Sequence, residues 1–173
     1  MKRLAFLVAG LLFFLCAAAQ VDVNNVYTAA APVGATKLTT DEMRTYVRNN
    51  FKVSLVPGNH DFTYLADGII ICSWDLKSDP QYLKPLDTLH MRVVRGARKN
   101  STINSERIET INNVRFSICE FQHDQDGEVY IRFSSDVNKN LQSMNGILQF
   151  KAADKDKAHQ YLKNLLESLK FKE

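Results

Sequence analysis

Apolar and polar residues alternate through the last third of the chain, which is the period of half-buried β-strands. Val114, Phe116 and Ile118 carry the clearest alternation, and the same pattern resumes after a polar gap. The expected strands are 107–111, 114–119, 129–133 and 147–150, separated by turn residues at Asn112-Asn113, 124–127 and Asn145-Gly146.

The hydrophobic period changes to that of a helix at the end of the chain. Asp154 is a residue type that favours a helix N-cap. The residues that follow place one apolar face opposite lysines and polar side chains, which predicts an amphipathic closing helix. Its apolar positions are Ala158, Tyr161, Leu162, Leu165 and Leu169.

Another helix is expected from about Thr40 to Asn50. Thr39 and Glu42 have the spacing of a capping box, and Met43, Tyr46 and Val47 follow at helical intervals. Strands are predicted after this helix at 53–55, 62–65 and 69–74, with turns at 57–59 and Asp67-Gly68. The segment 69–74 is apolar at successive positions, which indicates a central strand covered on both faces.

The region between these strands and the last third supports two interpretations. Pro80 and Pro85 are placed as first residues of helices, and apolar residues then recur at helical spacing up to Gly96 or Asn100. The β-branched Val93 and Val94 leave a strand over 89–94 as the alternative. The helical stripe consists of Leu86, Leu89, His90, Val93 and Ala97.

Antiparallel strands with amphipathic helices predict an α+β domain in which a sheet is flanked by helices. Three segments, Glu109 to Phe116, Met144 to Phe150 and Leu165 to Phe171, resemble the closing half of PsbP/DcrB-like domains, over about residues 106–172. This resemblance implies an α/β/α sandwich of a superfamily used mainly as binding or assembly modules, often extracytoplasmic. It implies no catalytic residues and no cofactor.

The first nineteen residues have the pattern of a secretory signal. Lys2 and Arg3 precede an apolar run from Leu4 to Cys16, and Ala17 to Ala19 supply the small residues of a cleavage site before Gln20. The run is shorter than the roughly 20 residues of a membrane-spanning helix. We therefore expect an exported chain that is periplasmic or extracellular and could associate with the envelope. We expect no transmembrane segment after cleavage.

Lipidation at Cys16 is the alternative fate of this segment, and the bulky Leu15 before it disfavours that outcome. Residues 20–37 have no apolar period and are rich in alanine, which indicates an extended or flexible lead-in. The expected organisation is a signal at 1–19, this lead-in at 20–37 and one α+β domain at 38–173.

Removal of the signal changes the charge balance. The full chain has 22 Lys and Arg against 19 Asp and Glu, and the signal contains two of the basic residues and no acidic one. The remaining chain has a net charge of +1. A nearly neutral domain has no global field for nucleic acid, so we exclude nucleic-acid binding as the function class.

Cys72 and Cys119 remain after cleavage. In an oxidising compartment they could form a disulfide across a long loop. Each also lies within a predicted strand, where a cysteine behaves as a small apolar core residue. The sequence is compatible with both a disulfide and two free core cysteines.

No group of residues forms a catalytic, cofactor-binding or metal-binding motif. His60-Asp61 lies beside a predicted turn, and His123 precedes the acidic segment 124–128, in which Gly127 favours a hairpin turn over a cation loop. Arg92, Arg95, Arg98 and Lys99 recur on the predicted middle helix. They form either a solvated face or a surface for an anion or an acidic partner.

The sequence therefore favours an exported, non-catalytic binding or assembly domain of the cell envelope, with a protein partner there. Two alternatives belong to other classes. One is an envelope hydrolase that uses His60 and Asp61, or His123. The other is a small carrier with an apolar pocket beside Trp74, the single tryptophan.

Overall fold

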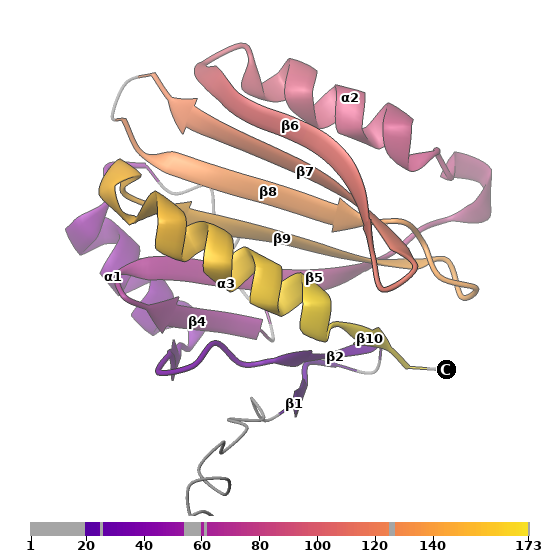
Figure 1. The fold of residues 1–173 in the computed structure, drawn as a ribbon, viewed down its shortest axis with the longest axis horizontal. Coiled ribbons are helices and arrows are strands. Elements are labelled where there is room, and N and C mark those ends of the chain that lie inside the picture. Colours follow the sequence, from indigo (N-terminus) through magenta and orange to yellow (C-terminus); the bar gives the residue numbers. More distant parts are fainter. Residues whose placement is uncertain (1–19, 25, 54–59, 61, 125–126, 173) are drawn as a thin grey trace, which may run out of the picture.

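The computed structural model of the chain describes residues 20–172 except 25, 54–59, 61 and 125–126. The predicted signal at 1–19, most of the predicted strand at 53–55 and the turn at 57–59 lie outside the described residues. The described residues form a single α+β domain of two antiparallel sheets and three α-helices, as Figure 1 shows.

The larger sheet has seven strands in the order β3-β4-β5-β9-β8-β7-β6, paired antiparallel throughout. β5 lies inside this order and is buried from Ile69 to Ser73, as predicted for a strand covered on both faces. The strands are β3 (Thr36–Lys37), β4 (Phe62–Ala66), β5 (Ile69–Lys77), β6 (Ser101–Ile111), β7 (Val114–His123), β8 (Val129–Ser135) and β9 (Gln142–Phe150).

Three helices cover this sheet in two layers (Figure 1). α3 (Lys155–Ser168) crosses one face, where its residues Leu162, Leu165 and Leu166 are buried. α1 (Thr40–Asn50) and α2 (Leu86–Ala97) cover separate parts of the other face. The sheet therefore has a hydrophobic core on each face, one under α3 and one under α1 and α2. The core under α1 and α2 contains Met43, Val47, Ile70, Cys72, Val94, Cys119, Phe121, Tyr130 and Ile147.

The N-terminal lead-in, expected to be extended or flexible, contains extended strands that are part of the fold, so the flexible alternative was wrong. β1 (Gln20–Asp22), β2 (Tyr27–Ala30) and β10 (Lys170–Phe171) form a second sheet beside α3. Tyr27 and Ala29 are fully buried, and Ala30 N donates a hydrogen bond to Ser168 Oγ. These partners lie about 140 residues away in sequence, which is why no local pattern indicated them.

Local signals placed the helix starts well. Thr39 and Glu42 form the predicted capping box, in which each side chain bonds the other residue's backbone N–H. α2 begins directly after Pro85, and the strand alternative over 89–94 is wrong because burial recurs there at helical intervals. Asp154 precedes α3 as predicted, but its side chain makes no capping hydrogen bond. A short 3₁₀ turn, η1 (Pro80–Tyr82), comes before α2, and another, η2 (Ala152–Asp154), before α3.

Two strands extend further than their patterns indicated. β6 starts at Ser101 because its outer position in the sheet lets polar residues alternate along it. β9 starts at Gln142, so Asn145-Gly146 lies within a strand and is no turn. The predicted turns at Asp67-Gly68 and Asn112-Asn113 are confirmed, since all four residues have positive φ.

None of the described helices has the length and apolar character needed to cross a membrane.

A candidate binding groove along helix α2

The structure separates the two cysteines that the sequence left open to pairing. Strand register places Cys72 of β5 and Cys119 of β7 in one row, with β9 and β8 between them. Three strand spacings correspond to about 14 Å, twice the largest Cα separation that a disulfide spans. Both residues are buried free thiols, so the disulfide interpretation is not realised. Burial raises the pKa of Cys72 to about 12 and that of Cys119 to about 11.

We expect both thiols to resist labelling by a thiol reagent in the native protein, because they are buried and protonated at neutral pH. After unfolding in guanidinium without reductant, the chain lacking residues 1–19 should titrate as two free thiols. Mass spectrometry of the labelled chain makes the measurement. A chain that takes up no label after unfolding would contain a disulfide and contradict the structure.

The histidines of the hydrolase alternative do not converge. His60 stacks on Trp74 with ring centroids 4.5 Å apart, and Asp61 lies outside the described residues. Trp74 is aligned across the sheet with Ser117, whereas His123 is six residues further along the same strand β7, which is about 20 Å. Within the described segments, no three His, Cys, Asp or Glu side chains gather where a metal ion could bind.

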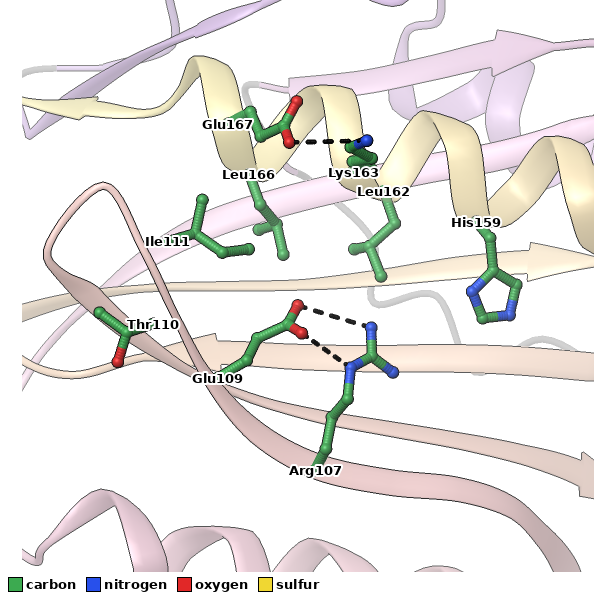
Figure 2. A pocket seen from close by; sticks show the side chains of 9 residues that line it. All are labelled: Arg107, Glu109, Thr110, Ile111, His159, Leu162, Lys163, Leu166 and Glu167. Atoms are coloured by element: carbon green, nitrogen blue, oxygen red, sulfur yellow. Dashed lines mark hydrogen bonds and ion pairs between the residues drawn. The ribbon is translucent and has the colours of Figure 1, made fainter.

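A cleft of about 370 Å³ lies between β6 and α3 (Figure 2). Its charged side chains pair within the cleft, as Figure 2 shows: Arg107 Nε is 3.0 Å from Glu109 Oε2, and Lys163 Nζ is 3.9 Å from Glu167 Oε1. Apolar side chains, Ile111, Leu162 and Leu166, lie between the two pairs. This cleft therefore presents little net charge or free hydrogen-bonding capacity to a ligand.

Beside the cleft, His159 reaches a buried carboxylate. Glu120 on β7 is 1 % exposed, and its oxygens lie 2.6 Å from His159 Nε2 and 2.8 Å from Lys155 Nζ. Asn104 Nδ2 donates a further hydrogen bond of 3.0 Å. Burial acts to raise the pKa of Glu120, but these hydrogen bonds outweigh it and hold that pKa below its ordinary value. The group fastens α3 to the sheet.

A longer groove runs along α2 on the opposite face. One hollow of about 340 Å³ lies between η1, the first turns of α2 and the ends of β5, β8 and β9. A second hollow of about 350 Å³ continues along the last turns of α2. Arg92, Val93 and Arg132 line both hollows, so the two form one groove with these residues at its middle.

Arg132 is a residue of this candidate groove that sequence reasoning missed. It is exposed although β8 lies inside the sheet, because α1 and α2 leave this part of the face uncovered. Its register partners Cys119 and Ile147 are buried. In the sequence it occupies an ordinary polar position of an alternating strand, so only the arrangement of the helices distinguishes it.

The basic residues predicted on α2 divide into paired and unpaired groups. Arg98 Nη2 lies 3.3 Å from Glu106 Oε1, and the nearby Arg115 pairs with Asp87 and Asp136. Within the described part of the chain, no carboxylate pairs with Arg92, Arg95, Lys99 or Arg132. Of these four, Arg92 and Arg132 share the groove, Arg95 lines a different hollow together with Arg92, and Lys99 lies beyond α2.

Exposed apolar side chains form one end of the groove. Tyr82 is 72 % exposed, Leu76 54 % and Leu83 42 %, and all three line the first hollow. Exposed aromatic and aliphatic residues gathered around a hollow are typical of interaction surfaces. The pocket beside Trp74 that the carrier alternative predicts corresponds to the same hollow, because Asn145, the register partner of Trp74, lines it. The floor at that point is polar.

The architecture, a helix-covered antiparallel sheet with a C-terminal helix on one face, is a PsbP-like α+β fold. The chain is similar to cyanobacterial PsbP (CyanoP) from Synechocystis sp. PCC 6803, with a TM-score of 0.52 at 8 % identity, over 84 % of this chain and 86 % of that one. The predicted resemblance over 106–172 is thus confirmed as a likeness of fold that extends over most of the domain.

A second solved structure, the protein PA94 from Pseudomonas aeruginosa, has a TM-score of 0.44 at 10 % identity, over 82 % of this chain and 88 % of that one. No model of a known protein family matches the sequence. No curated protein matches it either.

Proposed function

We propose that this protein is an exported, non-catalytic binding or assembly domain of the cell envelope, and that the groove along α2 is its contact surface for a protein partner. The observation that carries the proposal is the pair Arg92 and Arg132. Both lack an acidic partner within the described residues and line one groove, beside exposed Tyr82, Leu76 and Leu83.

Export is supported by the signal pattern of residues 1–19 and by where the fold begins. Cleavage before Gln20 would leave β1 complete, and Gln20 itself contacts the end of α3 through a hydrogen bond to the Ser168 carbonyl oxygen. The proposed location is the periplasm or the extracellular side of the envelope.

A contact role suits the chemistry of the groove better than hydrolysis does. His60 and His123 lie too far apart to share one cleft, whereas Tyr and Arg are side chains that contribute strongly to protein interfaces. The unpaired arginines also add selectivity, because a partner with an acidic group there gains ion pairs that an unmatched partner lacks.

The test is affinity purification of the tagged protein from the envelope fraction of its own organism. We expect a chain that begins at Gln20 by intact mass, and so has lost Cys16 without lipidation, and a specific partner protein. The double variant Tyr82→Ser/Leu83→Ser should recover at least tenfold less of that partner, since it removes the apolar end of the groove.

Val33→Ser is the matched control, because Val33 is also exposed but lies near α3 on the other side of the domain. It should leave partner recovery unchanged. Equal recovery with both variants would show that the groove is not the contact surface. A chain that retains residues 1–19 in the cytosol would overturn the export proposal.

A further inference from the structure

The layout of the groove is symmetrical about its charged middle. On one side of Arg92 and Arg132 lie the exposed apolar residues Tyr82 and Leu83. On the other side the second hollow is lined by Gly96, Ala97 and Phe121 and by the polar residues Asn100, Ser101 and His123. A linear ligand that fills both hollows therefore meets exposed apolar side chains beside a polar floor, then two guanidinium groups, then a second hollow of mixed apolar and polar lining.

The two guanidinium groups approach this middle from different layers. Arg92 projects from the helix and Arg132 from the uncovered part of the sheet beside it, and neither is held by a carboxylate of the described residues. The basic residues of the first hollow, Lys84, Arg92 and Arg132, outnumber its two acidic residues: Asp136 pairs with Arg115, and Asp79 keeps its charge and accepts hydrogen bonds from Gln81. Two free arginines favour a carboxylate, which can accept two hydrogen bonds from one guanidinium.

The floor of the groove distinguishes between classes of ligand. Ser134 Oγ donates a hydrogen bond of 2.7 Å to Asn145 Oδ1, and both side chains line the first hollow together with Ser143. An acyl chain laid over these groups would remove water from them and return no hydrogen bond, which costs free energy. A peptide backbone has donors and acceptors of its own to offer them.

The length of the groove sets the length of the ligand. α2 has 12 residues, which corresponds to about 18 Å at the helical rise of 1.5 Å per residue. An extended peptide covers that distance with five or six residues at about 3.3 Å each. The central residue of such a peptide lies near the two arginines, and its ends lie in the two hollows.

We infer that the groove binds an extended segment of the partner protein, five or six residues long, with a central Glu or Asp flanked by apolar residues. This inference rests on the proposed function, because it specifies the partner of the same surface. The acidic side chain is bound by Arg92 and Arg132, and the flanking apolar side chains occupy the two hollows.

The test uses the peptide acetyl-Leu-Ser-Glu-Ser-Leu-amide, with Gln and Lys versions as matched ligands. Binding to the exported protein is followed by amide chemical shifts in NMR, which detect weak complexes, and by Trp74 fluorescence. We expect the Glu peptide to bind at least tenfold more tightly than the Gln peptide, and the Lys peptide not to bind. The preference should weaken with added salt, as expected of an exposed charge contact.

Arg92→Gln and Arg132→Gln should each weaken binding of the Glu peptide at least fivefold. Arg48→Gln, on the exposed face of α1, should leave it unchanged. Arg132→Lys supplies a second variant that keeps the charge in the sheet and loses the forked geometry, and it should give an intermediate loss. Equal affinity for the Glu and Gln peptides, or the same loss with Arg48→Gln, would overturn the inference.

Dodecanoate and phosphatidylglycerol vesicles provide the lipid arm of the experiment. Saturable binding of either one through Arg92 and Arg132, without peptide binding, would overturn the peptide in favour of an anionic lipid. If the partner is captured through Tyr82 and Leu83 but the peptides do not bind, only this inference fails. If partner capture also fails to depend on the groove, the proposed function fails with it.

Discussion

Gly146→Ala should destabilise the domain by about 3 kcal/mol, the upper end of the usual cost of overpacking a core. Gly146 lies in β9 opposite Phe133 of β8. A Cβ atom there would overlap the Phe133 ring and lie 2.7 Å from the carbonyl oxygen of Cys72. The ring is fully packed and the carbonyl belongs to β5, so neither can withdraw without disturbing three strands. Thermal or denaturant unfolding followed by circular dichroism measures the loss.

Gly96→Ala is the matched control for this substitution. Gly96 lies in α2, and a Cβ atom there meets no other atom within 4 Å. Alanine should therefore stabilise the protein by about 0.5–1 kcal/mol, through its higher helix propensity and the lower entropy of the unfolded chain. A Gly146→Ala protein as stable as the wild type would contradict the register of β5, β9 and β8.

Glu120→Gln should lower the free energy of unfolding by about 2 kcal/mol at neutral pH, because it removes the charge that holds Lys155 and His159. The cost stays below that of an entirely buried ion pair, since Lys155 is half exposed and regains water. Denaturant unfolding at pH 7 provides the measurement. Glu109→Gln is the control: its pair with Arg107 is more than one-third exposed on both sides, so its loss should cost at most about 1 kcal/mol.

The effect of Glu120 should depend on pH in a defined direction. Its pKa is lower in the folded protein than its ordinary value of 4.5, so the folded state favours the ionised form. The stabilisation is therefore fully present above about pH 4.5 and is lost as the pH falls through the lowered pKa. The difference between wild type and Glu120→Gln should shrink over that acidic range. A difference that grows on acidification would contradict the arrangement around Glu120.

Elements stabilised by neighbouring residues were predictable. The capping box of Thr39 and Glu42, the turn at Asn112-Asn113 and the apolar face of the closing helix each depend on contacts within a few positions. Their residue spacing therefore carries the information directly. The predictions were wrong where the local sequence favours a structure that distant contacts override. Asn145-Gly146 has the composition of a turn, yet its glycine is required by an aromatic ring on another strand.

The candidate site was only half predictable. Arg92 stood out because basic residues recur along one helix, whereas its counterpart Arg132 has the appearance of any polar strand residue. The two become one site because α2 lies beside an uncovered part of β8. Arg95, Arg98 and Lys99, which were predicted together with Arg92, do not line the groove. Their positions and ion-pair partners could not be read from residue spacing. Arg98, for example, pairs with Glu106 of β6.

By itself, the sequence determined the α+β class, the export pattern, most strands and all three helices, because periodicity, caps and turns are local properties of the chain. Tertiary structure alone decided which distant residues meet. It joined residues 20–30 to the C-terminus in a second sheet, held Cys72 and Cys119 three strands apart, and brought Arg92 to Arg132. These outcomes depend on the order of strands and the placement of helices, which arise from the packing of the whole core.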